Sequence, residues 1–150
     1  MSPSTFYSRF TACKSGPRGL PIKHLQFGFA DEYAADGLTY LSTDTLTNIE
    51  NATGSAFADA LFGSHGNNVL QGLGGADLIA GGEGVDTAWY AGATGSVTVD
   101  LAAGTASGAD GNDTLGGIEA ITGSSFDDLL IGDSGSNSLT GRDGNDTLLG

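Results

Sequence analysis

The sequence predicts an all-β fold in which short strands stack on one another and are joined by glycine-rich turns. Two observations predict this fold. One is a nine-residue spacing of glycines, at Gly54, Gly63, Gly72 and Gly81 and again at Gly123, Gly132, Gly141 and Gly150. The other is that a polar and an aliphatic residue keep fixed places within each nonapeptide. A repeat of this kind is typical of a solenoid, in which a unit buries its apolar residue only by stacking on its neighbours.

Four positions of the nonapeptide are constrained. Position 1 is glycine in all eight units, among them an isolated unit at residues 108–116, and position 4 is glycine in all except those of Phe57 and Phe126. Position 6 carries Asp59, Asn68, Asp77, Asp86, Asp113, Asp128, Asn137 and Asp146. Position 8 carries Leu61, Leu70, Ile79, Ala88, Leu115, Leu130, Leu139 and Leu148.

Each unit divides into a turn and a strand. Positions 1–6 favour a turn, because glycine adopts the positive φ angles that other residues avoid. Positions 7–9 form a strand of about 10 Å, and the side chain at position 8 points away from its two neighbours. We therefore expect the position-8 side chains to face inward and to build a narrow apolar ladder. A helix is a poor alternative, because each interior glycine costs roughly 1 kcal/mol relative to alanine.

A longer repeat lies on top of the nonapeptides. Residues 44–81 match residues 113–150 at an offset of 69, with 19 of 38 positions identical. Because 69 is seven nines plus six, the nonapeptide phase must slip once, and we place the slip at residues 117–122. Residues 90–107 lack the glycine–aspartate pattern and are expected to form one metal-poor coil, in which Val97, Val99 and Leu101 alternate as in a strand.

The charge of the chain is strongly one-sided. The net charge is −13, and from Asp31 onward 18 acidic residues face one base, Arg142, an excess of 17. Such a segment repels itself, nucleic acids and anionic membranes, so a multivalent cation is its natural partner. The single cysteine, Cys13, excludes an internal disulfide. No apolar run is long enough to span a membrane, and we expect no cleaved signal peptide.

Two units carry a resemblance to a known family. GGEGVDTAW at residues 81–89 and GRDGNDTLL at residues 141–149 resemble the GGxGxDxUx repeat of RTX proteins, the haemolysin-type calcium-binding family. The resemblance covers residues 44–150. It implies a right-handed parallel β-roll, or β-solenoid, with two nonapeptides per coil and calcium ions between stacked turns. It also implies a secreted, extracellular protein that leaves a bacterial cell by type I secretion.

The chemistry of the repeat suits calcium. Calcium takes six to eight oxygens and mixes carboxylates with backbone carbonyls, whereas magnesium prefers a strict octahedron and keeps its waters. Two units per coil would place turns 18 residues apart on one side of the roll. The expected pairs are then Asp59 with Asp77, Asn68 with Asp86, and Asp128 with Asp146. No EF-hand loop is present.

The expected calcium ligands are the position-6 residues and glycines of their turns. They are Asp59, Gly66, Asn68, Gly72, Gly75, Asp77, Gly81, Gly82, Gly84, Asp86, Gly111, Asp113, Asp128, Gly135, Asn137, Gly141, Gly144 and Asp146. The turns of Asp77, Asp86 and Asp146 rank first because they are closest to the repeat pattern. Asn68 and Asn137 offer only neutral oxygens, the two phenylalanine-containing units lack the position-4 glycine, and the isolated unit has no well-matched neighbour.

These features predict a non-enzymatic module in which calcium binding is coupled to folding. No zinc-protease HExxH motif and no GxxxxGK[ST] phosphate loop occurs. Two alternatives stay open: the export and folding remnant of a secreted protease, lipase or epimerase, and a structural or adhesive extracellular repeat.

Two regions are expected along the chain. Residues 1–43 show no period and are expected to be irregular or disordered, with residues 31–43 a transitional segment that could contribute a strand. Residues 44–150 are expected to form the roll, with a first block at 54–89, the metal-poor coil at 90–107 and a second block at 108–150. Gly150 would begin another unit, so we expect a fragment of a longer parent chain with further repeats or domains.

Overall fold

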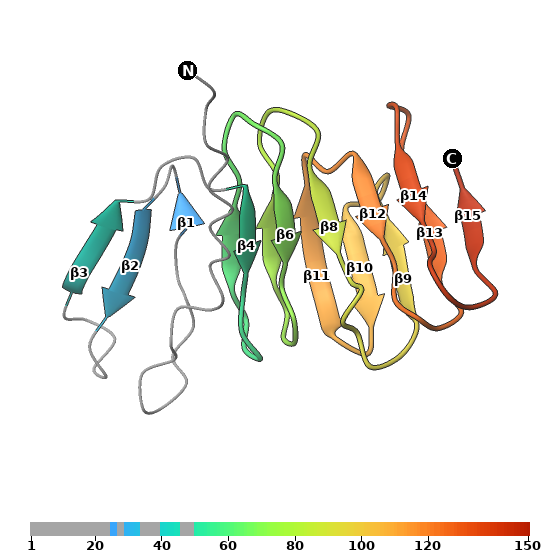
Figure 1. Ribbon diagram of the computed structural model, residues 1–150, viewed down its shortest axis with the longest axis horizontal. Coiled ribbons are helices and arrows are strands. Elements are labelled where there is room, and N and C mark those ends of the chain that lie inside the picture. The colour runs from blue at the N-terminus through green and yellow to red at the C-terminus, as the bar shows by residue number, and fades with distance from the viewer. Residues whose placement is uncertain (1–24, 27–28, 34–39, 46–49) are drawn as a thin grey trace, which may run out of the picture.

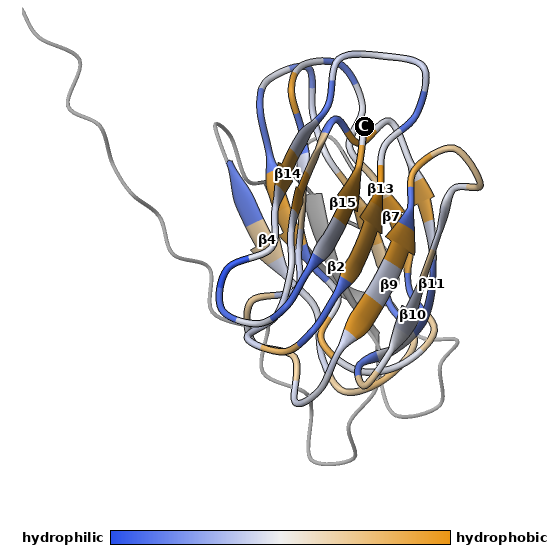
Figure 2. Ribbon diagram, turned by 90° about the vertical axis from the view of Figure 1, so that its right-hand side faces the viewer, coloured by the Kyte–Doolittle hydropathy of each residue, from blue (hydrophilic) through white to orange (hydrophobic). Residues whose placement is uncertain are grey.

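Two facing sheets of short strands make up the fold. The computed structural model describes residues 25–26, 29–33, 40–45 and 50–150, and within these residues it contains fifteen strands and no helix (Figure 1). Figure 2, which looks along the stack, shows the two sheets side by side with the turns above and below them. In this part of the chain no helix is long and apolar enough to cross a membrane.

The larger sheet has ten strands and is called the long sheet here. Its order is β15 (Thr147–Leu149), β13 (Leu129–Ile131), β9 (Val97–Asp100), β10 (Thr105–Gly108), β11 (Gly111–Gly116), β7 (Leu78–Ala80), β5 (Ala60–Phe62), β1 (Leu25–Gln26), β2 (Phe29–Tyr33) and β3 (Tyr40–Thr45). The short sheet has five strands, in the order β14 (Ser138–Thr140), β12 (Ala120–Thr122), β8 (Thr87–Trp89), β6 (Val69–Gln71) and β4 (Asn51–Thr53).

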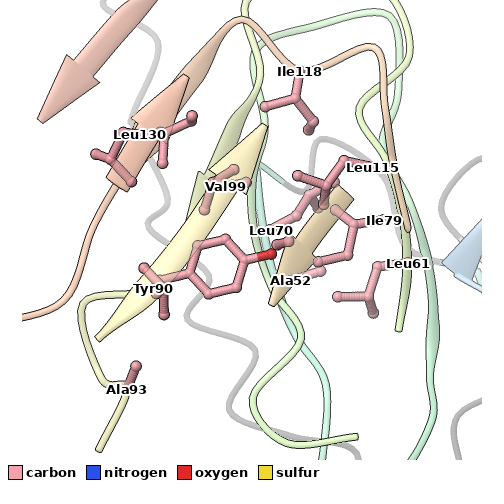
Figure 3. Packing of buried hydrophobic residues seen from close by; sticks show 14 residues of the cluster. Ala52, Leu61, Leu70, Ile79, Tyr90, Ala93, Val99, Leu115, Ile118 and Leu130 are labelled. Carbon is pink, nitrogen blue, oxygen red and sulfur yellow. The ribbon is translucent and has the colours of Figure 1, made fainter. Parts of the chain in front are cut away.

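Consecutive nonapeptides alternate between the two sheets, so residues 18 apart pair in parallel. Leu61 lies beside Ile79 in the long sheet, and Leu70 lies beside Ala88 in the short sheet. In strands β4 to β6 only the middle residue is buried. The position-8 side chains thus form the predicted ladder core between the sheets (Figure 3). Leu148, in the last described strand, is 46% exposed.

The N-terminal region contains more strands than the one that we expected from residues 31–43. Most of residues 1–43 lie outside the described residues, but 25–26, 29–33 and 40–45 are the strands β1, β2 and β3. β1 pairs in parallel with β5, and β2 and β3 follow it in antiparallel order. Without β1, the side of β5 that faces away from β7 would be an edge with unpaired backbone N–H and C=O groups, and β1 pairs with this edge at Leu61.

The middle of the chain also differs from the expected single coil. β9 pairs with β10, and β10 with β11, both antiparallel, so residues 97–116 form a meander rather than one parallel coil. β11 lies beside β7 and β9 lies beside β13, which inserts the meander into the long sheet between the two repeat blocks. Val97 and Val99 are buried as the alternation predicts. The physical reason is that the chain reverses twice, at a turn that ends in Gly104 with positive φ and at a turn flanked by Gly108 and Gly111, which also have positive φ.

The predicted slip in phase is a shortened turn. Leu115 in the long sheet and Ile121 in the short sheet are only six residues apart, against nine elsewhere (121 − 115 = 6). Ile121 nevertheless pairs with Ala88 on one side and with Leu139 on the other. The short sheet therefore continues in register through residues 117–122.

Candidate metal-binding turns

Two rows of turns run along the roll, one on each side. The long-sheet row contains the turns at 54–59, 72–77, 123–128 and 141–146, each of which leads into a strand of the long sheet. The short-sheet row contains the turns at 63–68, 81–86 and 132–137, which lead into strands of the short sheet. In both rows the position-6 side chain lies at the point where a turn becomes a strand.

The position-6 side chains connect successive coils. Asp77 Oδ1 accepts the backbone N–H of Asp59 at 2.8 Å, and Asp86 Oδ1 accepts that of Asn68 at 2.7 Å. Asp146 Oδ1 accepts the N–H of Asp128 at 2.9 Å. The three pairs expected at a spacing of 18 residues are therefore adjacent in the structure. Each of these carboxylates thus uses one oxygen to accept a hydrogen bond from the preceding coil.

Glu119 belongs to the same series, although the sequence analysis did not identify it. The N–H of Asp86 donates to Glu119 Oε2 at 2.9 Å, so Glu119 acts as the position-6 residue for the strand β12. The signal in the sequence is the pair Ile118–Glu119, which aligns with Ile49–Glu50 just before the strand β4. Glu119 is out of phase with the nine-residue spacing, because the turn before it is shortened.

Four turns close on themselves through hydrogen bonds, and we call them the closed turns: residues 54–59, 63–68, 123–128 and 132–137. In each, the N–H of position 2 donates to the position-6 side chain, at 2.5 Å, 2.7 Å, 2.6 Å and 2.8 Å respectively. The position-2 side chain in turn accepts the N–H of position 4. Position 2 is Ser55, Ser64, Ser124 or Asp133.

Three turns have a different backbone, and we call them the open turns: residues 72–77, 81–86 and 141–146. Their position-2 residues have positive φ, at 70° for Leu73, 105° for Gly82 and 80° for Arg142. Their position-4 glycines also have positive φ, at 131° for Gly75, 120° for Gly84 and 121° for Gly144. Among the described residues, Leu73 and Arg142 are the only non-glycine residues with positive φ. Their backbone is therefore strained.

Two open turns contain a buried carboxylate oxygen without a partner. Asp77 is 2% exposed and Asp86 is 0% exposed, and Oδ2 of each makes no hydrogen bond. Burial raises the pKa of Asp77 to about 6, against an opposing effect of the N–H of Asp59. Burial also raises the pKa of Asp86, and the negative charge of Glu119 adds to this effect. Both carboxylates are thus costly to ionise as they stand.

The carboxylate of Asp113, unlike those of Asp77 and Asp86, has a hydrogen-bond donor from the chain at each oxygen. The hydroxyl of Tyr90 donates to Asp113 Oδ2 at 2.9 Å, and Asp113 Oδ1 accepts the N–H of Asp77 at 3.0 Å. Tyr90 lies within the hydrophobic cluster between the sheets (Figure 3). Burial raises the pKa of Asp113, and the hydrogen bonds from Asp77 and Tyr90 lower it again. Both oxygens of this carboxylate therefore have partners from the chain.

Oxygen atoms converge over the position-1 glycine of the turns, in open and closed turns alike, and such oxygens suit a hard cation. A Cβ atom at Gly81 would meet the Asp86 Oδ2 at 2.5 Å and would overlap the carbonyl oxygen of Gly117, so the two oxygens converge over the Cα of Gly81. A Cβ atom at Gly72 or Gly141 would likewise overlap the position-6 carboxylate of its own turn. In the part of the chain that the structure describes, no three His, Cys, Asp or Glu side chains gather into a group that could hold a metal ion. A cation at these turns would thus take most of its ligands from backbone carbonyls, as calcium does readily.

The other glycines expected as ligands lie in three settings: open turns, closed turns and the meander. Gly75, Gly82, Gly84 and Gly144 lie in open turns and have positive φ. Gly66 and Gly135 lie in closed turns and do not. Gly111 has φ of 121°, but in the turn of the meander between β10 and β11.

The comparison with protein families identifies the repeat. Four copies of the RTX calcium-binding nonapeptide repeat match residues 53–88 and 122–150. These two ranges contain all three open turns and all four closed turns. No curated protein matches the chain.

Proposed function

Because the chain carries repeats of the RTX calcium-binding family, we propose that it binds calcium ions at its turns and that this binding is coupled to its folding. One observation carries the proposal: Oδ2 of Asp77 and Oδ2 of Asp86 are buried and have no hydrogen-bond partner. A buried carboxylate oxygen is costly to leave unpaired, and a divalent cation would supply both a partner and a compensating charge.

The ligands would come from the open turns and the coils stacked against them. Asp77, Asp86 and Asp146 would give carboxylate oxygens, and the glycine-rich backbone would give carbonyl oxygens. When bound, the ion supplies positive charge to a segment in which acidic residues outnumber basic ones by 17 (18 − 1 = 17). Without it, the roll buries uncompensated carboxylates around a core that is one ladder of side chains wide. The ion-free chain is therefore expected to be largely unfolded.

This coupling suits a module of a secreted bacterial protein. Extracellular calcium-binding modules work with dissociation constants of about 10⁻⁴–10⁻³ M, a range that calcium reaches outside cells and not inside them. A chain of this kind stays unfolded during export and folds on meeting extracellular calcium. The module itself has a binding role and no catalytic one.

Far-UV circular dichroism during a calcium titration tests the proposal, with magnesium as the matched control. A cooperative gain of β signal is expected with calcium at millimolar concentration, and no comparable gain is expected with magnesium. A chain whose spectrum does not change with calcium, and which retains no calcium after equilibrium dialysis, would refute the proposed function. An equal response to magnesium would refute the assignment to calcium.

A further inference from the structure

We propose that the position-2 side chains Ser55, Ser64, Ser124 and Asp133 replace calcium at their own turns, so that ions bind only at the three open turns. This inference rests on the proposed function and states where in the roll it is performed. Seven repeat turns look alike at position 1 and carry an oxygen at position 6. The structure separates them by whether the chain itself satisfies the polar groups of the turn.

In the closed turns, the chain itself supplies hydrogen-bond donors to the position-6 side chain. In the turn at 123–128, the N–H of Ser124 donates to Asp128 Oδ2 at 2.6 Å, and its hydroxyl donates to Asp128 Oδ1 at 2.7 Å. The same hydroxyl accepts the N–H of Phe126 at 3.0 Å, and Ser124 is fully buried. Asp128 Oδ1 also accepts the N–H of Val97. Both oxygens of Asp128 thus have donors, whereas Asp77 and Asp86 each keep one oxygen unpaired.

The residue types at position 6 follow the same division. All three open turns carry a carboxylate there, Asp77, Asp86 and Asp146, whereas two of the four closed turns carry an amide, Asn68 and Asn137. A neutral amide oxygen is sufficient to accept a backbone N–H, as Asn68 Oδ1 does from Ser64. A carboxylate is the stronger ligand where the partner is a cation, because it also supplies negative charge. Both buried oxygens that lack a partner from the chain thus belong to carboxylates, those of Asp77 and Asp86.

Position 4 gives an independent indication. Both phenylalanines at this position, Phe57 and Phe126, lie in closed turns, where the backbone does not require positive φ. In the open turns, a Cβ atom would also collide with the preceding coil. At Gly75 it would meet the carbonyl carbon of Phe57 at 2.6 Å, and at Gly144 it would meet the carbonyl oxygen of Phe126 at 2.6 Å. An open turn and a side chain at position 4 are thus incompatible.

The test counts the calcium ions that the full chain retains at saturating calcium, by equilibrium dialysis with elemental analysis and by isothermal titration calorimetry. The parent chain is expected to bind three ions. Asp77→Asn, Asp86→Asn and Asp146→Asn are each expected to lose one ion. Asp59→Asn and Asp128→Asn are the matched controls, because the same change is made at position 6 of closed turns, and they are expected to keep all three.

The outcomes separate this inference from the proposed function. A parent chain without bound calcium would overturn the proposed function. A parent chain that binds calcium, with controls that lose ions as the open-turn variants do, would overturn only the inference. Circular dichroism at saturating calcium establishes that each variant is folded. Crystals of the parent chain grown in calcium give a measurement that needs no variant. Anomalous peaks that are all held by residues of the open turns support the inference. Any peak held only by residues of a closed turn overturns it.

Discussion

The hydrogen bond between Tyr90 and Asp113 allows a measurement of how much a donor from the chain stabilises a buried carboxylate. Tyr90→Phe keeps the buried ring and removes only the hydroxyl, which donates to Asp113 Oδ2 at 2.9 Å. Because Asp113 is 5% exposed, no water readily takes the place of the hydroxyl. A hydrogen bond to a charged group contributes about 1.5–3 kcal/mol, and an unsatisfied buried acceptor costs a similar amount. We expect the free energy of unfolding to fall by about 2 kcal/mol.

The measurement is a urea titration at saturating calcium, followed by circular dichroism, on a double-mutant cycle with Asp113→Ala. In the Asp113→Ala background the carboxylate is absent, so Tyr90→Phe is expected to cost less than about 0.5 kcal/mol. Equal m values in all four chains would show that the same transition is compared. The reasoning is refuted if Tyr90→Phe costs the same with and without Asp113, or if it costs nothing in the parent chain.

Gly75→Ala is expected to destabilise the calcium-loaded roll by more than about 1 kcal/mol, because Gly75 has φ of 131° and a Cβ there would collide with backbone. Gly66→Ala, at the same repeat position with its nearest atom 3.9 Å away, is expected to be nearly neutral, and equal losses in urea titrations would contradict this account. Ile79→Ala is expected to cost about 2–5 kcal/mol because Ile79 is 1% exposed, whereas Leu148→Ala, at a 46% exposed position 8, is expected to cost less than half as much by the same measurement. In calcium-free buffer, the pKa of Asp77 in the folded chain, about 6, lies above its ordinary value of 3.8. Protonation of Asp77 therefore stabilises the folded chain fully below about pH 4, and this contribution to stability is lost as the pH rises through about 6. The β signal at pH 4.5 is therefore expected to exceed that at pH 7.5, and Asp77→Asn is expected to weaken this dependence; an unchanged dependence in Asp77→Asn would count against a role for Asp77.

Much of the fold follows from features that act within a single nonapeptide. The nine-residue glycine spacing and the aliphatic position 8 predict the short strands and the ladder of Leu61, Leu70 and Ile79, since glycine turns and strand alternation are local properties. The sequence also ranks the turns of Asp77, Asp86 and Asp146 first, and these are the three open turns. The serine at position 2 of three closed turns was visible in the sequence too, but its meaning depends on the φ of the turn.

Tertiary structure alone decided the contacts between residues far apart in the chain. The bond from Tyr90 to Asp113 spans 23 residues, and the bond from Asp86 to Glu119 spans 33. Both depend on the antiparallel meander at 97–116, in which residues 97–107 were expected to belong to a single coil and residues 108–116 to a repeat unit. No local pattern fixes where that segment enters the long sheet, because its register is set by pairing with β7 and β13, which belong to different repeat blocks. For the same reason, only the folded chain shows which position-6 oxygens have partners from the chain and which two are left buried without one.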